Sequence, residues 1–338
     1  MQYTKNSEEL NNKQLLETEF CMKKFLVSID TEGDNLWKWV VGKPITTENA
    51  KFLPRFQELC EKYGFKPTYL TNYEMAKDPF FANYFKKKSE ENLCEIGMHL
   101  HAWNSPPDFE LEIRNDVPAG ASYITEYPIE IIEKKVDFLT NLLENTFETD
   151  IIIHRSGRWA TNQEYFKILD KRNYKVDCSV TPMIDWTKTA GQSPNSCGTN
   201  YAGFPKTPYI IKNTDILEIP VTIRENHRLR TLENCGIKKS IKRIYEAKKG
   251  YGPLWLRPKN TKENLQDLLY LTDKISREPK TDYLMFMLHS SEFMPGGSPT
   301  FTTDESIEHL YENLEMLFKH ISKNFSGCNF KEYYEKHK

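Results

Sequence analysis

The chain has 338 residues, 38% of them hydrophobic and 13% aromatic, which is enough apolar material for a large folded core and argues against disorder. Its 46 basic and 48 acidic residues leave a formal net charge of -2, so no overall field attracts nucleic acid or an anionic membrane. The sequence also has no long apolar span and no N-terminal apolar h-region, so we expect no stable membrane insertion.

Cysteine usage indicates a reducing compartment. The seven cysteines are odd in number and form no C-x-x-C pair, which is typical of free thiols rather than of a disulfide framework or a zinc knuckle. The basic segment 234–250 could bind a polyanion, but a solvated helix face explains it more simply. We therefore expect a cytoplasmic protein with no nucleic-acid partner.

Strand and helix patterns alternate along the first half of the chain. After a polar leader over residues 1–23, the run KFLVSID at 24–30 predicts a fully buried strand, and apolar residues at helical spacing predict a helix over 47–63. The alternation continues through segments expected at 66–71, 77–90, 93–101, 125–147, 150–155, 161–172 and 174–180. Strands that alternate with helices imply a parallel sheet.

A stretch rich in Pro, Gly, Ser and Asn follows at 181–208, and its length favours a functional loop over an ordinary connection. Beyond it the patterns predict strands at 216–222 and 283–289 and helices at 234–250, 261–276 and 303–323. About seven strands without a repeat or a dividing linker predict one irregular α/β barrel over residues 24–325, followed by a polar tail at 326–338. An open, doubly wound sheet is the alternative.

Chemically capable side chains fall where the predicted strands end. They are Asp30, His99, His101, Arg155 and His289. Because the carboxyl ends of parallel strands face one side of a barrel or open sheet, we expect these residues to meet on one rim.

The pattern H-x-H at His99 and His101 is a candidate metal site. Alternate residues of a strand point to the same face, so both imidazoles can converge on one ion, although an isolated pair is more often two satisfied histidines. An acidic strand end on the same rim favours the metal. One carboxylate with two imidazoles leaves positions open, as catalytic zinc requires, and a second carboxylate can act as a base. Asp30 and Glu32, in SIDTEGD, supply such a pair.

Arg155 and His289 complete the candidate catalytic set. An arginine on this rim would keep the basic carboxylate ionised and oriented, or it could form a purely structural ion pair. A histidine opposite the metal suits protonation of a leaving amine, whereas a buried, inert histidine is the simpler alternative.

In this order, the motifs resemble those of the polysaccharide deacetylases of the NodB-homology type, carbohydrate esterase family four. The resemblance runs from about Lys24 to Phe318 and is carried by SIDTEGDNLW, PTYLTNYEMA, EIGMHLHAWNSPP, HRSGRWA and MLHSSEFMPGGSP. These stretches look most like the WbmS-type branch, which is associated with bacterial O-antigen and capsule gene clusters. The resemblance implies a single α/β domain folded as a distorted (β/α)7 barrel.

The sequence departs from the family pattern at three motifs. The family has two histidines four residues apart, but the residue four beyond His99 is a tryptophan, so His101 must substitute if the metal site is intact. The proline and tyrosine usual near the arginine are replaced around Arg155. Leu288 directly precedes His289, whereas the family has one residue between them.

The resemblance implies a metal-dependent hydrolase of a C–N bond other than a peptide bond, which removes an N-acetyl or similar acyl group from a sugar. Asp30 would be the base, and His289 would protonate the departing amine. One divalent ion, for which we expect Zn²⁺, would be held by Glu32, His99 and His101, with Asp34 as the fallback ligand.

The substrate would be a nucleotide-linked or lipid-linked amino sugar in the biosynthesis of O-antigen or capsule. Candidates to contact it are Trp37, Trp103, Arg158 and Trp159, although ordinary packing explains several tryptophans equally well. Two other functions stay open at this point. One is an amidase of the same superfamily that acts on a cyclic, non-sugar amide, and the other is a carbohydrate-binding barrel that has lost catalysis.

Overall fold

The computed structural model describes residues 22–38, 43–112, 114, 122–226, 241, 252–262 and 264–338. The predicted leader lies outside this part of the chain up to residue 21, and the helix predicted over 234–250 lies outside it apart from Ile241. Within the described ranges, no helix combines the length and the apolar character needed to cross a membrane.

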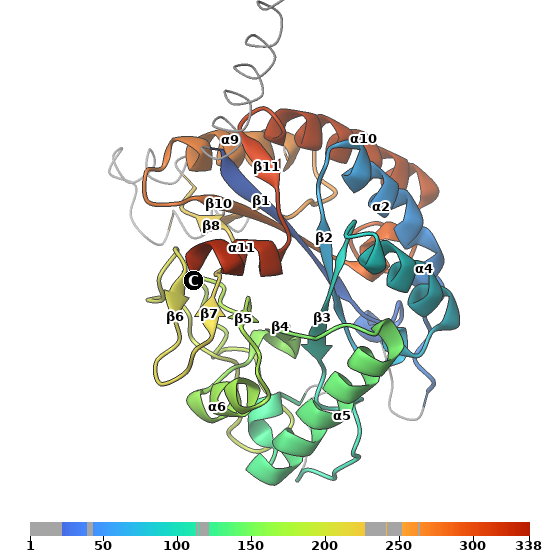
Figure 1. Ribbon diagram of the computed structural model, residues 1–338, viewed down its shortest axis with the longest axis vertical. Helices are drawn as coiled ribbons and strands as arrows, with labels where there is room; N and C mark the ends of the chain where they lie inside the picture. The colour runs from blue at the N-terminus through green and yellow to red at the C-terminus, as the bar shows by residue number, and fades with distance from the viewer. Residues whose placement is uncertain are drawn as a thin grey trace, which may run out of the picture.

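One curled, largely parallel sheet organises the fold (Figure 1). Its strands follow the order β10-β1-β2-β3-β4-β5-β7-β6, and β11 also pairs with β1. The path bends into a half-barrel, so the predicted single α/β domain is confirmed, in a form whose described strands do not close into a ring. The strands of this sheet are β1 (Lys23–Thr31), β2 (Pro67–Thr71), β3 (Glu95–Leu100), β4 (Ile153–Ser156), β5 (Val176–Asp177), β6 (Tyr209–Ile210), β7 (Leu217–Glu218), β10 (Tyr283–His289) and β11 (Phe325–Gly327).

Helices surround this sheet, and a two-stranded ribbon of β8 (Ile223–Arg224) and β9 (Leu254–Trp255) lies apart from it in the pairing pattern (Figure 1). The α-helices are α2 (Leu53–Lys62), α3 (Tyr73–Ala76), α4 (Pro79–Glu90), α5 (Ile129–Phe147), α6 (Gln163–Lys171), α9 (Asn264–Arg277), α10 (Asp304–Ile321) and α11 (Phe330–His337). Short 3-10 helices are η1 (Leu36–Lys38), η2 (Glu48–Phe52), η3 (Ile124–Glu126), η4 (Gly157–Trp159) and η5 (Ser290–Phe293). The longer helices fall close to the ranges predicted from periodicity.

The central strand β1 is buried on both faces, and its side chains alternate between two apolar clusters. Phe25 and Ile29 pack between the sheet and the helices, whereas Leu26 packs inside the curl. Since neighbouring side chains of a strand point in opposite directions, Asp30 shares the inner face with Leu26. The last residue of β10, His289, lies beside Asp30 in the parallel register.

Two strands are shorter than their sequences suggest. The runs at 174–180 and 216–222 predict seven-residue strands, but β5 and β7 each keep only two residues in the ladder. The flanking backbone stays nearby, since Cys178 donates its N–H to the carbonyl of His154 and Val221 donates to Val180. These segments therefore continue as extended chain that bends away from regular pairing.

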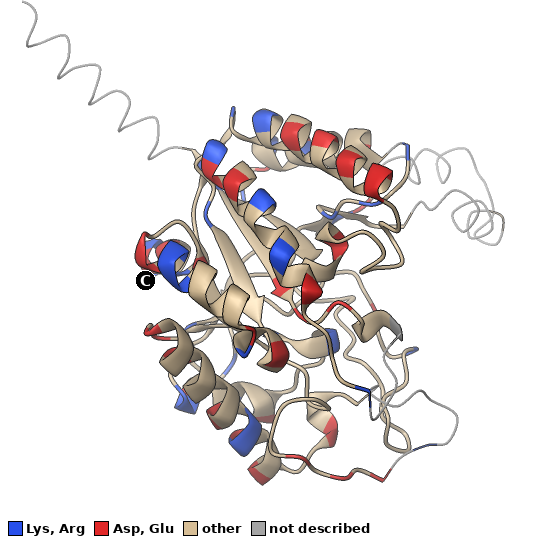
Figure 2. Ribbon diagram, turned by 90° about the vertical axis from the view of Figure 1, so that its right-hand side faces the viewer, with Lys and Arg blue, Asp and Glu red and all other residues tan. Residues whose placement is uncertain are grey.

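Acidic and basic residues are interspersed over the outer helices on the face that Figure 2 shows. Some pair between helices, such as Arg55 of α2 with Glu308 of α10 and Lys62 of α2 with Glu315 of α10, each at 2.6 Å. Exposed pairs of this kind contribute at most about 1 kcal/mol each. This face offers no extended field of one sign that would attract a polyanion.

The C-terminal residues 326–338, which composition suggests are a polar tail, form part of the folded unit. β11 pairs with β1, and the α11 side chains of Phe330 and Tyr333 are fully buried in the cluster inside the curl. The carboxylate of Glu95 accepts the first N–H groups of α11, from Phe330 and Lys331, each at 3.0 Å. The expectation was wrong because two apolar positions three residues apart are a weak pattern on so short a helix.

The docking of α11 can be tested by truncating its buried aromatic side chain. We expect Phe330→Ala to lower the free energy of unfolding by about 3 to 5 kcal/mol, the usual cost of removing a buried phenyl ring. Lys331→Ala, on the exposed side of the same helix, should cost less than about 1 kcal/mol. Urea unfolding measures the free energy of unfolding of both variants. If both substitutions left it unchanged, residues 326–338 would be a tail that does not contribute to the fold.

Glu95 makes the stability depend on pH. Burial raises the pKa of Glu95 from 4.5 to about 7, because its carboxylate is enclosed beneath α11. The folded state then binds the proton more tightly than the unfolded chain, so this group's contribution to stability falls as pH rises from 4.5 to 7. Compared with Glu95→Gln, the wild type should lose up to about 3 kcal/mol across that range. Urea unfolding at several pH values measures the difference, and parallel stability curves for the two proteins would contradict it.

Candidate metal centre and catalytic site

Side chains from four strand ends meet on the inner face of the curl, as the sequence predicts. His99 of β3 lies beside Arg155 of β4 in register, and Asp30 of β1 lies beside His289 of β10. All four side chains are buried or nearly so. The parallel sheet thus brings residues far apart in sequence into one polar site.

Glu32, His99 and His101 form one buried group of potential metal ligands. One ligand atom from each lies within 4.8 Å of the others. The Glu32 Oε2 atom is 2.8 Å from His101 Nε2 and 3.7 Å from His99 Nε2. The two imidazole rings lie with centroids 4.7 Å apart, which is the convergence expected of alternate residues in an extended chain.

Hydrogen bonds and burial prepare these side chains to hold a cation. His99 Nδ1 donates to the carbonyl of Arg155 at 3.0 Å, so Nε2 is the ring nitrogen that faces Glu32. Burial lowers the pKa of His101 and so favours the neutral ring that a metal needs. Burial would raise the pKa of Glu32, but hydrogen bonds from His101 and His99 outweigh it and hold this pKa well below its usual range. Burial would lower the pKa of His99 as well, but the charges of Asp30 and Glu32 outweigh it and raise this pKa, so a bound metal would have to displace a proton from His99. One carboxylate with two imidazoles is a donor set that fits Zn²⁺.

The backbone of Glu32 is fixed by two polar side chains. Its N–H donates to Ser290 Oγ at 3.0 Å, and its carbonyl accepts from Ser290 Oγ at 2.8 Å and from Asn49 Nδ2 at 2.7 Å. Both partners are completely buried. The acidic turn is therefore tied to η5 and η2 as well as to its own strand.

Asp34 lies outside this ligand group. Its carboxylate accepts from Thr46 Oγ1 at 2.5 Å and from the N–H of Asn49 at 3.3 Å. These contacts secure the turn after Glu32. In this arrangement Glu32 provides the carboxylate of the cluster, and Asp34 holds the loop.

Asp30 and Arg155 form a buried ion pair, with 2.6 Å between Arg155 Nη1 and Asp30 Oδ1. The guanidinium also donates to the carbonyl of Cys178 and to Ser28 Oγ, each at 3.0 Å. Burial would raise the pKa of Asp30, but the positive charge of Arg155 outweighs it and lowers this pKa below its usual value. Asp30 is therefore an ionised carboxylate, as a general base requires.

His289 faces Asp30 and Glu32 from the neighbouring strand, β10. Its Nε2 lies 3.9 Å from Asp30 Oδ2 and 4.0 Å from Glu32 Oε1. On its other side, Nδ1 lies 3.0 Å from the fully buried Glu292, which also accepts the backbone N–H of His289 at 3.0 Å. Arg257 Nη2 lies 3.2 Å from both oxygens of Glu292.

Sequence reasoning missed Glu292 and Arg257. A capping-box pattern places Glu292 three residues after His289, and this spacing could have indicated the contact. Arg257 is 32 residues before His289, and no local pattern links the two.

The predicted substrate-contacting residues divide into two groups. Trp37 and Trp103 lie near the site, with ring centroids 5.0 Å from His289 and 5.5 Å from His101. Trp37 is 42% exposed, is anchored by its Nε1 donating to Ser291 Oγ at 3.0 Å, and lines a cavity of about 550 Å³.

Trp159 and Arg158 are held in η4 by other contacts. The guanidinium of Arg155 lies over the Trp159 ring at 5.1 Å, so this tryptophan packs against the ion pair. The guanidinium of Arg158 lies 4.0 Å from the centre of the Tyr123 ring and donates to the carbonyl of Ala190 at 3.2 Å. Both residues are partly exposed, and their contact with a substrate stays a prediction.

No protein-family model and no curated protein matches the sequence. A protein assigned as a polysaccharide deacetylase from Mycobacterium smegmatis has a similar structure, with a TM-score of 0.51 and 10% identity over 93% of this chain and 90% of that chain. A GH57-type branching enzyme from Pyrococcus horikoshii also matches, with a TM-score of 0.51 and 11% identity over 94% of this chain and 70% of that chain.

A protein assigned as a polysaccharide deacetylase involved in O-antigen biosynthesis, from Bordetella bronchiseptica, matches over 94% of this chain and 90% of that chain. Its identity is 10% and its TM-score is 0.39.

The chain thus has the α/β fold of the deacetylase and glycan-processing half-barrels. Within that class, it has the fold of the NodB-type polysaccharide deacetylases, as its motifs predict. At identities this low, structural similarity establishes the fold alone, and the chemistry has to be inferred from the residues of the site.

The ligand group makes a direct prediction about metal binding. The wild type should bind one Zn²⁺ per chain. Glu32→Gln or His101→Ala should weaken binding by more than about 100-fold, because removing a ligand should cost more than removing a hydrogen-bond partner of a ligand. Asp34→Asn should stay within about threefold of the wild type, because its side chain contacts only the turn. Competition titration with a chelating dye measures all three, and a loss confined to Asp34→Asn would move the carboxylate ligand to that residue.

Proposed function

We propose that the protein is a metal-dependent hydrolase that removes an N-acyl group, first of all N-acetyl, from an amino sugar. The observation that carries this proposal is the buried group of Glu32, His99 and His101 beside two distinct proton-transfer residues, Asp30 and His289. The fold of polysaccharide deacetylases supports it. A place in the biosynthesis of O-antigen or capsule in the cytoplasm rests on the motif resemblance.

The ligand group suits one Zn²⁺ ion. A divalent cation bound there would supply a Lewis acid that activates water and stabilises negative charge on the acyl oxygen. The remaining steps are assigned to side chains of this chain.

Asp30 is the base in this reaction. Its carboxylate is ionised by Arg155, and its second oxygen, Oδ2, faces His289 across the site. It takes a proton from the attacking water as the oxygen bonds to the acyl carbon. Arg155 fixes the carboxylate in one orientation, because the guanidinium is itself held by Cys178 and Ser28.

His289 is the acid. When its Nδ1–H donates to Glu292, its Nε2 faces the site. Nε2–H then protonates the amide nitrogen as the C–N bond breaks. The products are the free amine of the sugar and a carboxylic acid that carries the oxygen of water.

Trp37 is suited to contact the sugar. Its indole is anchored through Ser291, and its exposed part lines the cavity of about 550 Å³ close to His289. An aromatic face of this kind packs well against the C–H groups of a sugar ring. A nucleotide-linked or lipid-linked amino sugar would place its N-acyl group at the ligand cluster.

The reaction is tested by measuring acetate released from nucleotide-linked and lipid-linked N-acetylamino sugars by the Zn²⁺-loaded protein. We expect release from at least one of them. Loss of a positioned base or acid typically costs 10²- to 10⁴-fold in rate, so Asp30→Asn and His289→Gln should each reduce kcat by about that factor. Both variants should still bind Zn²⁺, since neither residue belongs to the ligand group.

Three results would contradict the proposal. Activity confined to cyclic amides would indicate the other amidase chemistry. Sugar affinity without hydrolysis, in a protein that binds no metal, would indicate a binding protein. Full activity of Asp30→Asn would remove the assigned base.

A further inference from the structure

The loop after β2 lies between the two loops that carry the proposed metal ligands. In the sheet, β2 separates β1 from β3, and Glu32 follows β1 while His101 follows β3. A residue that follows β2 can therefore reach both neighbouring loops. Glu74, in the short helix α3, does so.

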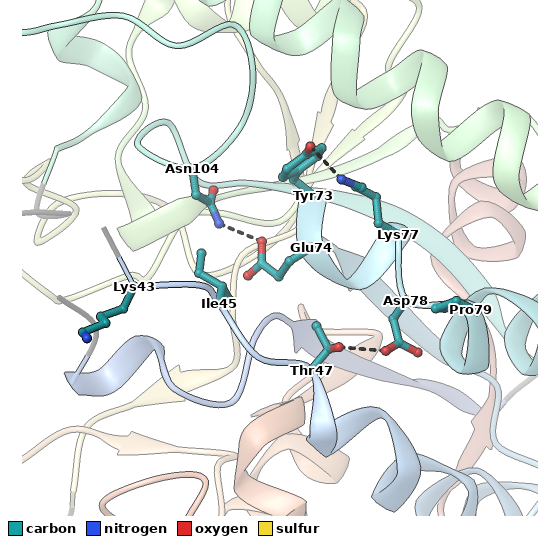
Figure 3. A pocket seen from close by; sticks show the side chains of 9 residues that line it. All are labelled: Lys43, Ile45, Thr47, Tyr73, Glu74, Lys77, Asp78, Pro79 and Asn104. Atoms are coloured by element: carbon teal, nitrogen blue, oxygen red, sulfur yellow. Dashed lines mark hydrogen bonds between the residues drawn. The ribbon is translucent and has the colours of Figure 1, made fainter. Parts of the chain in front are cut away.

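The carboxylate of Glu74 joins these loops through its two oxygens. Oε1 accepts the N–H of Gly33, the residue after Glu32, at 3.0 Å, and Oε2 accepts from Asn104 Nδ2 at 2.7 Å. Figure 3 shows Glu74 and Asn104 pointing toward one another from α3 and from the loop after β3. Asn72 Nδ2 also donates to Oε1, which fixes the side chain from its own loop.

The contact at Gly33 leaves little room for adjustment. A Cβ atom at this position would collide with Ile45 Cγ2 and would lie 2.9 Å from the carbonyl oxygen of Thr46 and 3.2 Å from Glu74 Oε1. The backbone of the acidic turn is therefore held between the segment at 45–46 on one side and Glu74 on the other. Loss of the Glu74 carboxylate would therefore free the backbone at Gly33, the residue next to Glu32.

We propose that Glu74 is a positioning residue that holds the loops of Glu32 and His101 at the separation that metal binding requires. This inference rests on the metal centre of the proposed function. The mechanism is geometric. Without the bridge, each loop keeps its own strand but loses a shared anchor, and the ligand atoms no longer stay within the 4.8 Å that groups them. Asn104 is the second half of the bridge.

The chain offers a conservative replacement that should preserve the bridge. Glu74→Gln keeps an oxygen for Gly33 and presents an amide to Asn104. Asn104 Oδ1 has no hydrogen-bond partner among the described residues, so rotation of this side chain by a half-turn would let it accept from the new amide. Burial raises the pKa of Glu74 to about 7, so a neutral side chain is already close to the native state near pH 7.

Two measurements on four variants test this role. The first is the Zn²⁺ dissociation constant by competition titration, and the second is amide hydrogen exchange of peptides that cover 31–36 and 101–106 in the metal-free protein. Glu74→Ala should weaken Zn²⁺ binding by roughly 10- to 100-fold and speed exchange in both peptides. Asn104→Ala should do the same more weakly, while Glu74→Gln should stay within about threefold of the wild type.

Lys77→Ala is the matched control, because Lys77 lines the same cavity of about 470 Å³ as Glu74 but its side-chain amine donates to Tyr73 and bridges neither loop (Figure 3). It should change neither measurement. Unchanged affinity and exchange in Glu74→Ala would overturn the inference, as would a Glu74→Gln variant as impaired as Glu74→Ala. If the wild type bound no Zn²⁺, the metal centre would fail, and exchange in the metal-free variants would still decide whether Glu74 joins the loops.

Discussion

The buried ion pair between Asp30 and Arg155 is the interaction on which the site depends. It joins β1 to β4 across the inside of the curl, although β2 and β3 separate these strands in the sheet. Removing two charges from water costs several kcal/mol per ion, which the pair recovers only with good geometry and further hydrogen bonds. The Cys178 carbonyl and Ser28 hydroxyl provide those bonds. Inside the curl, the sheet is therefore polar where its strands end, and apolar side chains pack toward the beginning of the strands.

The alternation of strand side chains explains what the sequence could predict. A charged residue near the end of a fully buried strand can point only toward the inner or the outer face, and both Asp30 of β1 and His289 of β10 point inward. The convergence of Asp30, His99, Arg155 and His289 followed from their positions alone. The partners Glu292, Arg257 and Glu74 did not, because they come from a 3-10 turn, an irregular segment and a four-residue helix. Likewise, the ladders of β5 and β7 are shorter than their apolar runs because local bending, which composition does not encode, ends their pairing.

The spacing of the histidines departs from the family motif without separating their rings. His99 is in β3 and His101 directly follows its last residue, so the extended backbone directs both rings to one side. The tryptophan that stands four residues after His99 packs its ring edge-on against His101. Trp103 thus packs against His101, and His101 brings the second imidazole to the group of potential ligands.

Three carboxylates within five residues are tolerated because each has its own set of donors. Asp30 is neutralised by a guanidinium, Glu32 faces two imidazoles, and Asp34 accepts from a hydroxyl and a backbone N–H. Asp30 has a fixed positive partner in Arg155, whereas the histidines that face Glu32 are charged only when protonated. A buried anion without a fixed cation is costly, and a divalent ion is the partner that this group of donors can recruit. A metal ion held by Glu32 would therefore balance the negative charge of a carboxylate that has no fixed cation beside it.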